Sequence, residues 1–158
     1  MTLCYLGLGS NLRSPQRQLR QAITLLQKLP RTTITSISSL YFSKPLGIRA
    51  QPYYCNLVIA LHTSLSPFWL LHYCQSIEKK HQRVRKKRWG ARTLDIDILL
   101  FGETIMTTNK LVLPHPQMLH RDFVLIPLLE IAPDIRLPNG EHLGSYLQNC
   151  EEYLIPPQ

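Results

Sequence analysis

Two aspartates, Asp95 and Asp97, are the residues of this chain with the clearest chemical meaning. They lie one residue apart on an apolar stretch, directly after a strongly basic segment, residues 79–92. In a strand, alternate side chains share a face, so both carboxylates point the same way while the apolar residues around them pack the other face. Two such carboxylates repel each other unless cations sit between them. Magnesium binds carboxylate and phosphate oxygens together, so the pattern predicts a magnesium–nucleoside triphosphate site.

The positive charge of the chain is concentrated in the segment 79–92. It holds eight of the 18 basic residues and no acidic one, which leaves ten basic residues against the ten acidic residues elsewhere. A field confined to one place indicates one anionic partner rather than a general affinity for nucleic acids or membranes. A basic run alone is more often a solvated loop. Because the two aspartates adjoin it, we interpret its arginines, with their planar forks, as phosphate ligands.

Length and composition are those of a soluble globular protein. The chain has 158 residues, 44% hydrophobic and 18% charged, which suits one compact domain. We expect neither secretion nor membrane insertion, because the N-terminus lacks a signal pattern and no run of about eighteen apolar residues occurs. The four cysteines form no Cys-x-x-Cys pair, so a cytoplasmic location fits best, with Cys4 and Cys74 expected in the core.

Strand and helix patterns alternate along the chain. In order, we expect a strand at 3–9 that reaches a turn at its glycines, a helix at 15–29 capped by Ser14, strands at 32–41 and 56–63 separated by a loop at 42–52, a helix from Pro67, and a strand at 93–101. This order is that of a ferredoxin-like α+β fold, an antiparallel sheet with helices packed on it. Residues 111–158 are rich in proline and should form a short C-terminal cap, with helices near 124–131 and 143–149.

Several motifs together resemble one enzyme family. They are Gly9-Ser10-Asn11-Leu12, Pro45-Leu46-Gly47, Gln51-Pro52, Asn56, Arg83-Val84-Arg85, Arg88-Trp89-Gly90-Ala91-Arg92-Thr93-Leu94-Asp95-Ile96-Asp97-Ile98-Leu99, Pro114-His115 and Glu130-Ile131-Ala132-Pro133. In this order they are similar to the 6-hydroxymethyl-7,8-dihydropterin pyrophosphokinases of folate biosynthesis. The resemblance implies transfer of pyrophosphate from ATP to the hydroxymethyl group of the pterin, with attack at the β-phosphorus and release of AMP. It also implies a single domain over 1–158, with mobile loops at about 42–53 and 82–93.

The resemblance also assigns roles to individual residues. Two magnesium ions would be held by Asp95 and Asp97, while Arg83 and Arg92 would act on the phosphates as catalytic residues. The residues implied to bind ATP are Gln75, Glu78, Arg85, Ile98, Lys110, His115 and Arg121. Those implied to bind the pterin are Ser43, Leu46, Tyr54, Asn56, Trp89 and Phe123. The chain departs from the family pattern at Lys44, Val112, Pro116 and a loop before Trp89 that is one residue shorter.

Some of these residues have ordinary structural interpretations when taken alone. Asn56 would more often be a turn or edge residue, Phe123 a core residue, and His115 an exposed loop residue. The pterin assignment is nevertheless chemically sensible. A flat heterocycle can stack between aromatic rings such as Trp89 and Phe123, and an amide offers it both a donor and an acceptor.

Two other classes of protein remain as alternatives. A basic chain on a ferredoxin-like sheet also describes nucleic-acid-binding modules, although two aspartates on a central strand would repel phosphate without a metal. Gly7-Leu8-Gly9 after a strand weakly suggests a dinucleotide-binding oxidoreductase, but Leu12 stands where the third glycine is needed. We therefore expect ATP and the pterin as partners of a monofunctional monomer, without nucleic acid or membrane.

Overall fold

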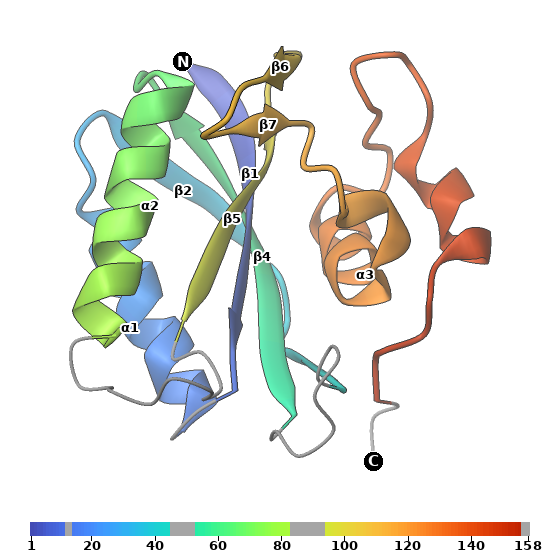
Figure 1. Cartoon of the computed structure of the whole chain (residues 1–158), viewed down its shortest axis with the longest axis horizontal. Helices are drawn as coiled ribbons and strands as arrows, with labels where there is room; N and C mark the ends of the chain where they lie inside the picture. Colours follow the sequence, from blue (N-terminus) through green and yellow to red (C-terminus); the bar gives the residue numbers. More distant parts are fainter. Residues whose placement is uncertain (12–13, 45–52, 83–93, 156–158) are drawn as a thin grey trace.

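The computed structural model describes residues 1–11, 14–44, 53–82 and 94–155. Its elements, shown in Figure 1, are β1 (Thr2–Ser10), α1 (Pro15–Gln27), β2 (Thr32–Ile37), β3 (Tyr41–Ser43), β4 (Tyr54–Thr63), α2 (Pro67–Gln82), β5 (Asp95–Phe101), β6 (Met106–Thr107), β7 (Val112–Leu113), the 3-10 helix η1 (Met118–His120), α3 (Asp122–Ile131) and the 3-10 helix η2 (Leu143–Asn149). Within these described ranges, no helix is both long enough and apolar enough to cross a membrane.

The main sheet has the strand order β2-β4-β1-β5, with β3 paired to β4, and every pair is antiparallel. The crossovers through α1 and α2 give the split βαβ arrangement, so the predicted ferredoxin-like α+β fold is confirmed. An antiparallel sheet also removes the dinucleotide-binding alternative, because that fold requires parallel strands. A small ribbon of β6 and β7 follows β5.

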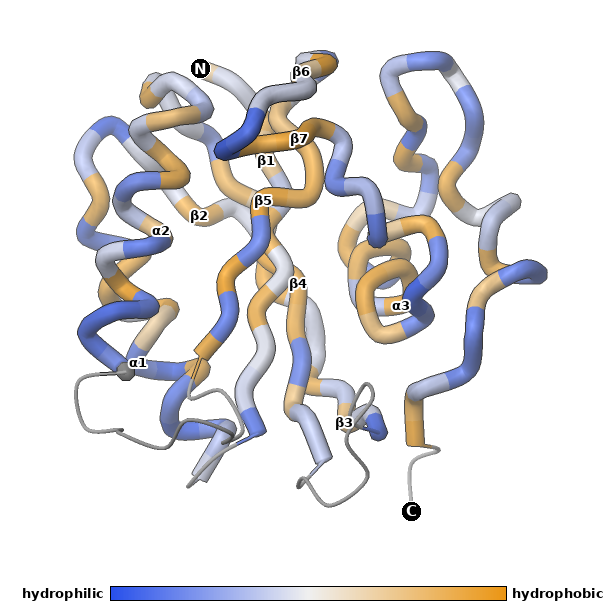
Figure 2. Tube along the Cα trace, viewed as in Figure 1, coloured by the Kyte–Doolittle hydropathy of each residue, from blue (hydrophilic) through white to orange (hydrophobic). Residues whose placement is uncertain are grey.

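Helices cover both faces of the sheet, as Figure 1 shows. On one face, α1 and α2 pack on a cluster that includes Cys4, Leu6 and Leu8 from β1, and the predicted burial of Cys4 and Cys74 is confirmed. On the other face, α3 buries Leu125 and Leu128 against a second cluster. Figure 2 shows apolar residues along the strands of the sheet and along α3. The C-terminal region is thus a second helical layer as well as a cap.

The predicted strand at 32–41 is interrupted in the structure. Ser38 lies between β2 and β3, and its hydroxyl accepts a hydrogen bond from Val58 N at 2.9 Å. A serine side chain that takes the place of a backbone carbonyl competes with the regular ladder, which explains the break. The predicted loop at 42–52 is wrong at its start, because β3 includes Phe42 and Ser43. Of the two loops predicted to be mobile, at about 42–53 and 82–93, residues 45–52 and 83–93 lie outside the described residues.

The start of α1 agrees with the sequence in position but not in mechanism. The helix begins at Pro15, as expected, and its backbone turns at Ser14, which has a left-handed φ of 55°. The Ser14 side chain makes no capping hydrogen bond. The predicted turn at Gly7 and Gly9 is also wrong, since β1 continues through both to Ser10.

Candidate active site

Asp95 and Asp97 lie on the face of the sheet that α3 covers. Ile96 between them packs into the opposite cluster, so the prediction that the carboxylates share a face is confirmed. Their cross-strand partners on β1 are Gly9 and Gly7. Because neither glycine has a side chain, the space in front of the two carboxylates is not filled from the neighbouring strand. The Asp97 side chain is 51% exposed, so it can meet a ligand.

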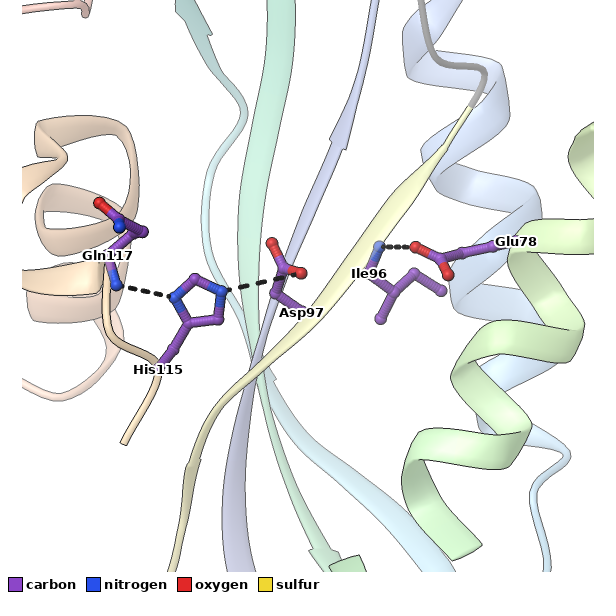
Figure 3. A network of polar contacts seen from close by, with 5 residues as sticks. All are labelled: Glu78, Ile96, Asp97, His115 and Gln117. Carbon is purple, nitrogen blue, oxygen red and sulfur yellow. Dashed lines mark hydrogen bonds and ion pairs between the residues drawn. The ribbon is translucent and has the colours of Figure 1, made fainter. Parts of the chain in front are cut away.

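A β-bulge places His115 beside this acidic pair. The register between β1 and β5 shifts next to Leu6, which leaves Leu99 as an extra residue on β5. Bulges often re-aim side chains near active sites. Here the Leu99 carbonyl accepts a hydrogen bond of 2.9 Å from His115 N. His115 Nε2 consequently lies 3.9 Å from Asp97 Oδ1, as Figure 3 shows.

A hydrogen bond to the His115 ring determines which of its two nitrogens carries the hydrogen. Nδ1 accepts a hydrogen bond from Gln117 N at 3.2 Å, so the neutral imidazole carries its hydrogen on Nε2. Burial lowers the pKa of His115; the Asp97 carboxylate opposes that shift, and the Arg121 guanidinium adds to it. Without bound ligands and near neutral pH, His115 is therefore a neutral imidazole whose Nε2–H can donate towards the acidic end of the pocket.

Glu78 holds β5 from the side of α2. Its carboxylate accepts a hydrogen bond of 2.8 Å from Ile96 N, the residue between the two aspartates (Figure 3). β5 is the last strand of the described sheet, so one row of its N–H groups points away from β1. Glu78 satisfies one of these groups and fixes the strand that carries Asp95 and Asp97. The structure shows this supporting contact, and a contact of Glu78 with ATP stays a prediction.

The other end of the pocket is a buried amide network. Asn56 lies on the central strand β4 and is only 5% exposed. Its Nδ2 donates to Ser43 Oγ at 2.8 Å and to the Tyr41 carbonyl at 3.3 Å. Asn56 is paired across the sheet with Gly9, where any Cβ would lie 3.2 Å from its Oδ1. The amide is therefore oriented by the sheet, and the interpretation as an edge residue does not apply.

Phe123 projects from the first turn of α3 over the same pocket. The Arg121 guanidinium carbon lies 5.7 Å from the centre of its ring, and Tyr153 contacts the ring edge-on at 5.7 Å between centroids. The ring is partly exposed, so it is not a simple core residue. An aromatic face next to a buried amide is a surface on which a flat polar ring can stack.

Glu130, one of the motif residues to which the sequence assigned no role, anchors α3 next to this network. Its carboxylate accepts hydrogen bonds from Ser39 N and Oγ and from the Tyr41 hydroxyl, at 2.5 to 3.2 Å. Burial opposes ionisation, but the bonds from Tyr41 and Ser39 lower the pKa of Glu130. The helix that carries Phe123 is thereby fixed to the strand that carries Ser43.

One pocket brings together eight of the predicted site residues. They are Ser43, Tyr54, Asn56, Asp95, Asp97, His115, Arg121 and Phe123. Gln75 and Lys110 line a separate hollow beside α2, and Ile98 is buried against α1 and α2. The predicted site residues Leu46, Arg83, Arg85, Trp89 and Arg92 lie outside the described residues. The roles of both sets stay predictions.

The pocket also contains residues that the sequence did not indicate as site residues. They are Gly7, Leu8, Gly9, Lys44, Leu57, Val58, Leu99, Met118 and Val124. The two glycines, one residue apart on a strand, were a usable signal, because they clear one face. Met118 and Val124 had no signal, since only the packing of η1 and α3 brings them to the sheet.

The donor set suits a hard cation. Asp95 and Asp97 offer carboxylate oxygens on one face, and magnesium completes its coordination with waters and substrate phosphates rather than with many side chains. The two carboxylates therefore fit a metal that takes its remaining ligands from water and substrate. Among the described residues there is no group of three or more histidine, cysteine or acidic side chains that could hold a metal ion.

Fold and site define the class of protein. It is a ferredoxin-like α+β enzyme whose pocket has carboxylates at one end and an amide with an aromatic ring at the other. A family model described as 7,8-dihydro-6-hydroxymethylpterin-pyrophosphokinase (HPPK) matches residues 5–133. The chain belongs to this family.

Relatives with the same function name cover nearly the whole chain. The protein of Pseudomonas aeruginosa named 2-amino-4-hydroxy-6-hydroxymethyldihydropteridine pyrophosphokinase is 49% identical over 146 residues, 92% of this chain and 90% of that protein. The Haemophilus influenzae protein of the same name is 48% identical over 153 residues, 97% of this chain and 96% of that protein. The predicted family and transferase class are confirmed, and the nucleic-acid-binding alternative has no support from these relatives.

Solved structures agree on the fold. An HPPK-DHPS solved in complex with substrates aligns with a TM-score of 0.70 at 14% identity, over 93% of this chain and 43% of that one. The Plasmodium falciparum HPPK-DHPS with pteroate aligns with a TM-score of 0.72 at 15% identity, over 93% of this chain and 42% of that one. This chain thus spans less than half the length of those solved chains, and at such identity the likeness concerns the fold alone.

Proposed function

We propose that this protein transfers pyrophosphate from ATP to the hydroxymethyl group of 6-hydroxymethyl-7,8-dihydropterin and releases AMP, a step of folate biosynthesis. The observation that carries the proposal is the pocket with two chemically different ends, in a chain of the pyrophosphokinase family. A nucleotide triphosphate needs the charged end, and a flat, amide-like heterocycle needs the other. Each end supplies a separate argument.

The amide end supports binding of the pterin. A buried asparagine that already donates to Ser43 and Tyr41 keeps its carbonyl oxygen on the pocket side, next to Gly9. A pterin presents ring N–H and amino donors together with a carbonyl acceptor, which such an amide can recognise. Stacking on Phe123 would add aromatic contact. Sites built to hydrogen-bond a substrate reject analogues that lack its polar groups.

The acidic end supports binding of the triphosphate. Asp95 and Asp97 would hold two magnesium ions, and the bound ions would neutralise charge on the phosphate oxygens. His115, with its hydrogen on Nε2, can donate to a phosphate oxygen that approaches Asp97. Arg121 faces the same pocket and can add positive charge. Arg83, Arg85 and Arg92 remain the predicted clamp from outside the described residues.

The bond changes follow from the substrates. The pterin hydroxyl releases its proton and its oxygen forms a bond to the β-phosphorus, while the bond from that phosphorus to the oxygen bridging to the α-phosphate breaks and leaves AMP. The protein's contribution is mainly positioning and electrostatic stabilisation, as in other phosphoryl transfers. The rigid sheet serves this purpose, because Asn56, Gly9 and Asp95 are neighbours in one row across three strands.

Incubation with ATP, magnesium and 6-hydroxymethyl-7,8-dihydropterin, followed by chromatography, tests the proposal. AMP formed in equal amount to pterin pyrophosphate is the expected result, and none should form without the pterin or with a chelator. Formation of ADP would instead indicate an ordinary kinase. If neither AMP nor ADP forms, the proposal is overturned.

We further propose that residues 1–158 act as one pyrophosphokinase domain, as a cytoplasmic monomer. The continuous sheet, with both faces covered by helices of the same chain, supports a self-contained unit. Light scattering of the purified protein at assay concentrations tests the monomer, since a dimer would double the measured mass.

A further inference from the structure

The end of the C-terminal segment 150–155 pairs with β3, at the amide end of the pocket, through one isolated antiparallel bridge. Lys44 N donates to the Tyr153 carbonyl and Ile155 N donates to the Phe42 carbonyl, both at 2.9 Å, around an antiparallel bridge between Ser43 and Leu154. Figure 2 shows the segment descending past α3 to the level of β3. β3 is therefore held between β4 and this segment. β3 carries both groups that accept hydrogen bonds from Asn56, the Tyr41 carbonyl and the Ser43 hydroxyl.

A single buried carboxylate holds the segment in place. Asp122, the first residue of α3, is 6% exposed, and its carboxylate accepts hydrogen bonds from Tyr153 N and Leu154 N at 3.0 to 3.1 Å. Bonds to an ionised acceptor are about twice as strong as neutral ones. The negative charge also lies at a helix N-terminus, where it is favourable. Asp122 thus joins the start of α3 to the end of the chain.

The same junction fixes the ring of Phe123. Tyr153 meets it edge-on, with an interplanar angle of 80°, and Arg121 lies against it. A parallel bridge between Arg121 and Glu151, with Glu151 N donating to the His120 carbonyl, continues the contact on the other side. The family model ends at residue 133, so the ring that positions Phe123 comes from the part of the chain beyond that match.

We propose that Asp122 is a positioning residue for the pterin: its carboxylate holds residues 153–155 against β3, so that Tyr153 orients the Phe123 ring and β3 keeps Ser43 on Asn56. This inference rests on the proposed function, because it requires a heterocycle at Phe123. Neither Asp122 nor Tyr153 lines the pocket, and both act through residues that do. Their loss should affect the pterin and leave ATP binding unchanged.

Steady-state kinetics of four variants test the proposal. Asp122→Ala removes both hydrogen bonds, Asp122→Asn keeps one acceptor oxygen, Tyr153→Leu removes the ring, and Tyr153→Phe keeps it. We expect KM for the pterin to rise about fivefold in Asp122→Ala and Tyr153→Leu, the size of one aromatic contact. Asp122→Asn should be intermediate, and Tyr153→Phe should restore the wild-type value. The KM for ATP should stay within about twofold, as should kcat at saturating pterin.

The controls separate this inference from the proposed function. Glu152→Ala alters an exposed neighbour and should behave as wild type. If Asp122→Ala fails to fold, the partly exposed Tyr153 carries the test through its two variants. If Tyr153→Leu keeps the wild-type KM for the pterin, or if the KM values for the pterin and for ATP rise equally, the positioning role is overturned. The proposed function still holds in that case, provided that the unmutated protein forms AMP. A wild-type protein that forms no AMP would overturn both.

Discussion

The two ends of the pocket are built in different ways. At the acidic end, Asp97 is half exposed, and the carboxylates are aligned by strand register opposite two glycines. At the amide end, Asn56 and Ser43 are buried and hydrogen-bonded to each other. Under the proposed function, the acidic end binds ligands that arrive with the substrate, whereas the side chains of the amide end are already held by their own hydrogen bonds. Mutations at the first should therefore remove chemistry without loss of stability, and mutations at the second should affect both.

The largest effect is expected from Asp97→Ala. Removing one of the two carboxylates that we propose bind magnesium should lower kcat at least about a thousandfold, because metal stabilisation of charge contributes several kcal/mol. The melting temperature should change little, since the side chain is 51% exposed. AMP formation at saturating substrates, together with thermal unfolding, measures both.

Asp134→Ala is the matched control for that experiment, because Asp134 is an exposed aspartate outside the pocket. It should retain wild-type turnover. Near-native activity of Asp97→Ala in magnesium would contradict the metal assignment. A large fall in its melting temperature would contradict the claim that this end of the pocket does not contribute to stability.

Asn56→Ala should show the opposite combination. It leaves Ser43 Oγ and the Tyr41 carbonyl without a buried donor, which should cost about 1–3 kcal/mol of stability. The pterin affinity should fall by about tenfold or more, while ATP affinity stays near wild type. Calorimetric titration and denaturant unfolding measure the two effects. Asn109→Ala, at an exposed asparagine, should change neither.

The sequence predicted most of the fold because its signals were local. Alternating apolar residues marked the strands, and Pro15 and Pro67 marked the first residues of α1 and α2. The exceptions were local competitions that the pattern did not show. The Ser38 hydroxyl takes a ladder position and divides the strand at 32–41, and two glycines that indicated a turn instead clear the floor of a pocket.

The site was less accessible to residue patterns than the fold. Asp95 and Asp97 could be placed from strand alternation alone, because they share one element. Asn56 lies on β4, His115 lies in the segment that follows β7, and Phe123 lies on α3. These three residues meet only through tertiary packing. Their roles were reached through family resemblance. Asp122 had no signal at all, because its partners, Tyr153 and Leu154, lie more than thirty residues later in the chain.

Two glycines on β1, Gly7 and Gly9, allow the two ends of the pocket to be compared by adding one methyl group at each position. A Cβ at Gly9 would lie 3.2 Å from Asn56 Oδ1, which is tighter than ordinary contact, whereas at Gly7 it would lie 3.4 Å from Leu99 Cδ2. Gly9→Ala should displace the amide and weaken pterin binding about fivefold, within the range of one perturbed hydrogen bond. Gly7→Ala should weaken it by less than about twofold. Fluorescence or calorimetric titration with the pterin distinguishes them, and equal effects would show that Asn56 is not the sensitive group.

The smallest effect concerns the charge of His115, which borders the acidic end. The Asp97 carboxylate favours the imidazolium and the Arg121 guanidinium disfavours it. Asp97→Asn should therefore lower the pKa of His115 further below its usual value, and Arg121→Met should raise it. NMR titration of the ring in the metal-free protein measures both, and shifts of the same sign would contradict this electrostatic description.

The sign of the stability effect follows from the same pKa. Because the folded protein holds the pKa of His115 below that of the unfolded chain, the unfolded chain binds a proton first as the pH falls. Stability from this group is thus lost as the pH drops through the unfolded pKa towards the folded one. Asp97→Asn should widen that loss and Arg121→Met should narrow it, as denaturant unfolding between about pH 7 and pH 5 would measure. Substitutions at the acidic end, which we expect to leave stability unchanged at pH 7, should therefore change stability at lower pH, because they alter the pKa of His115.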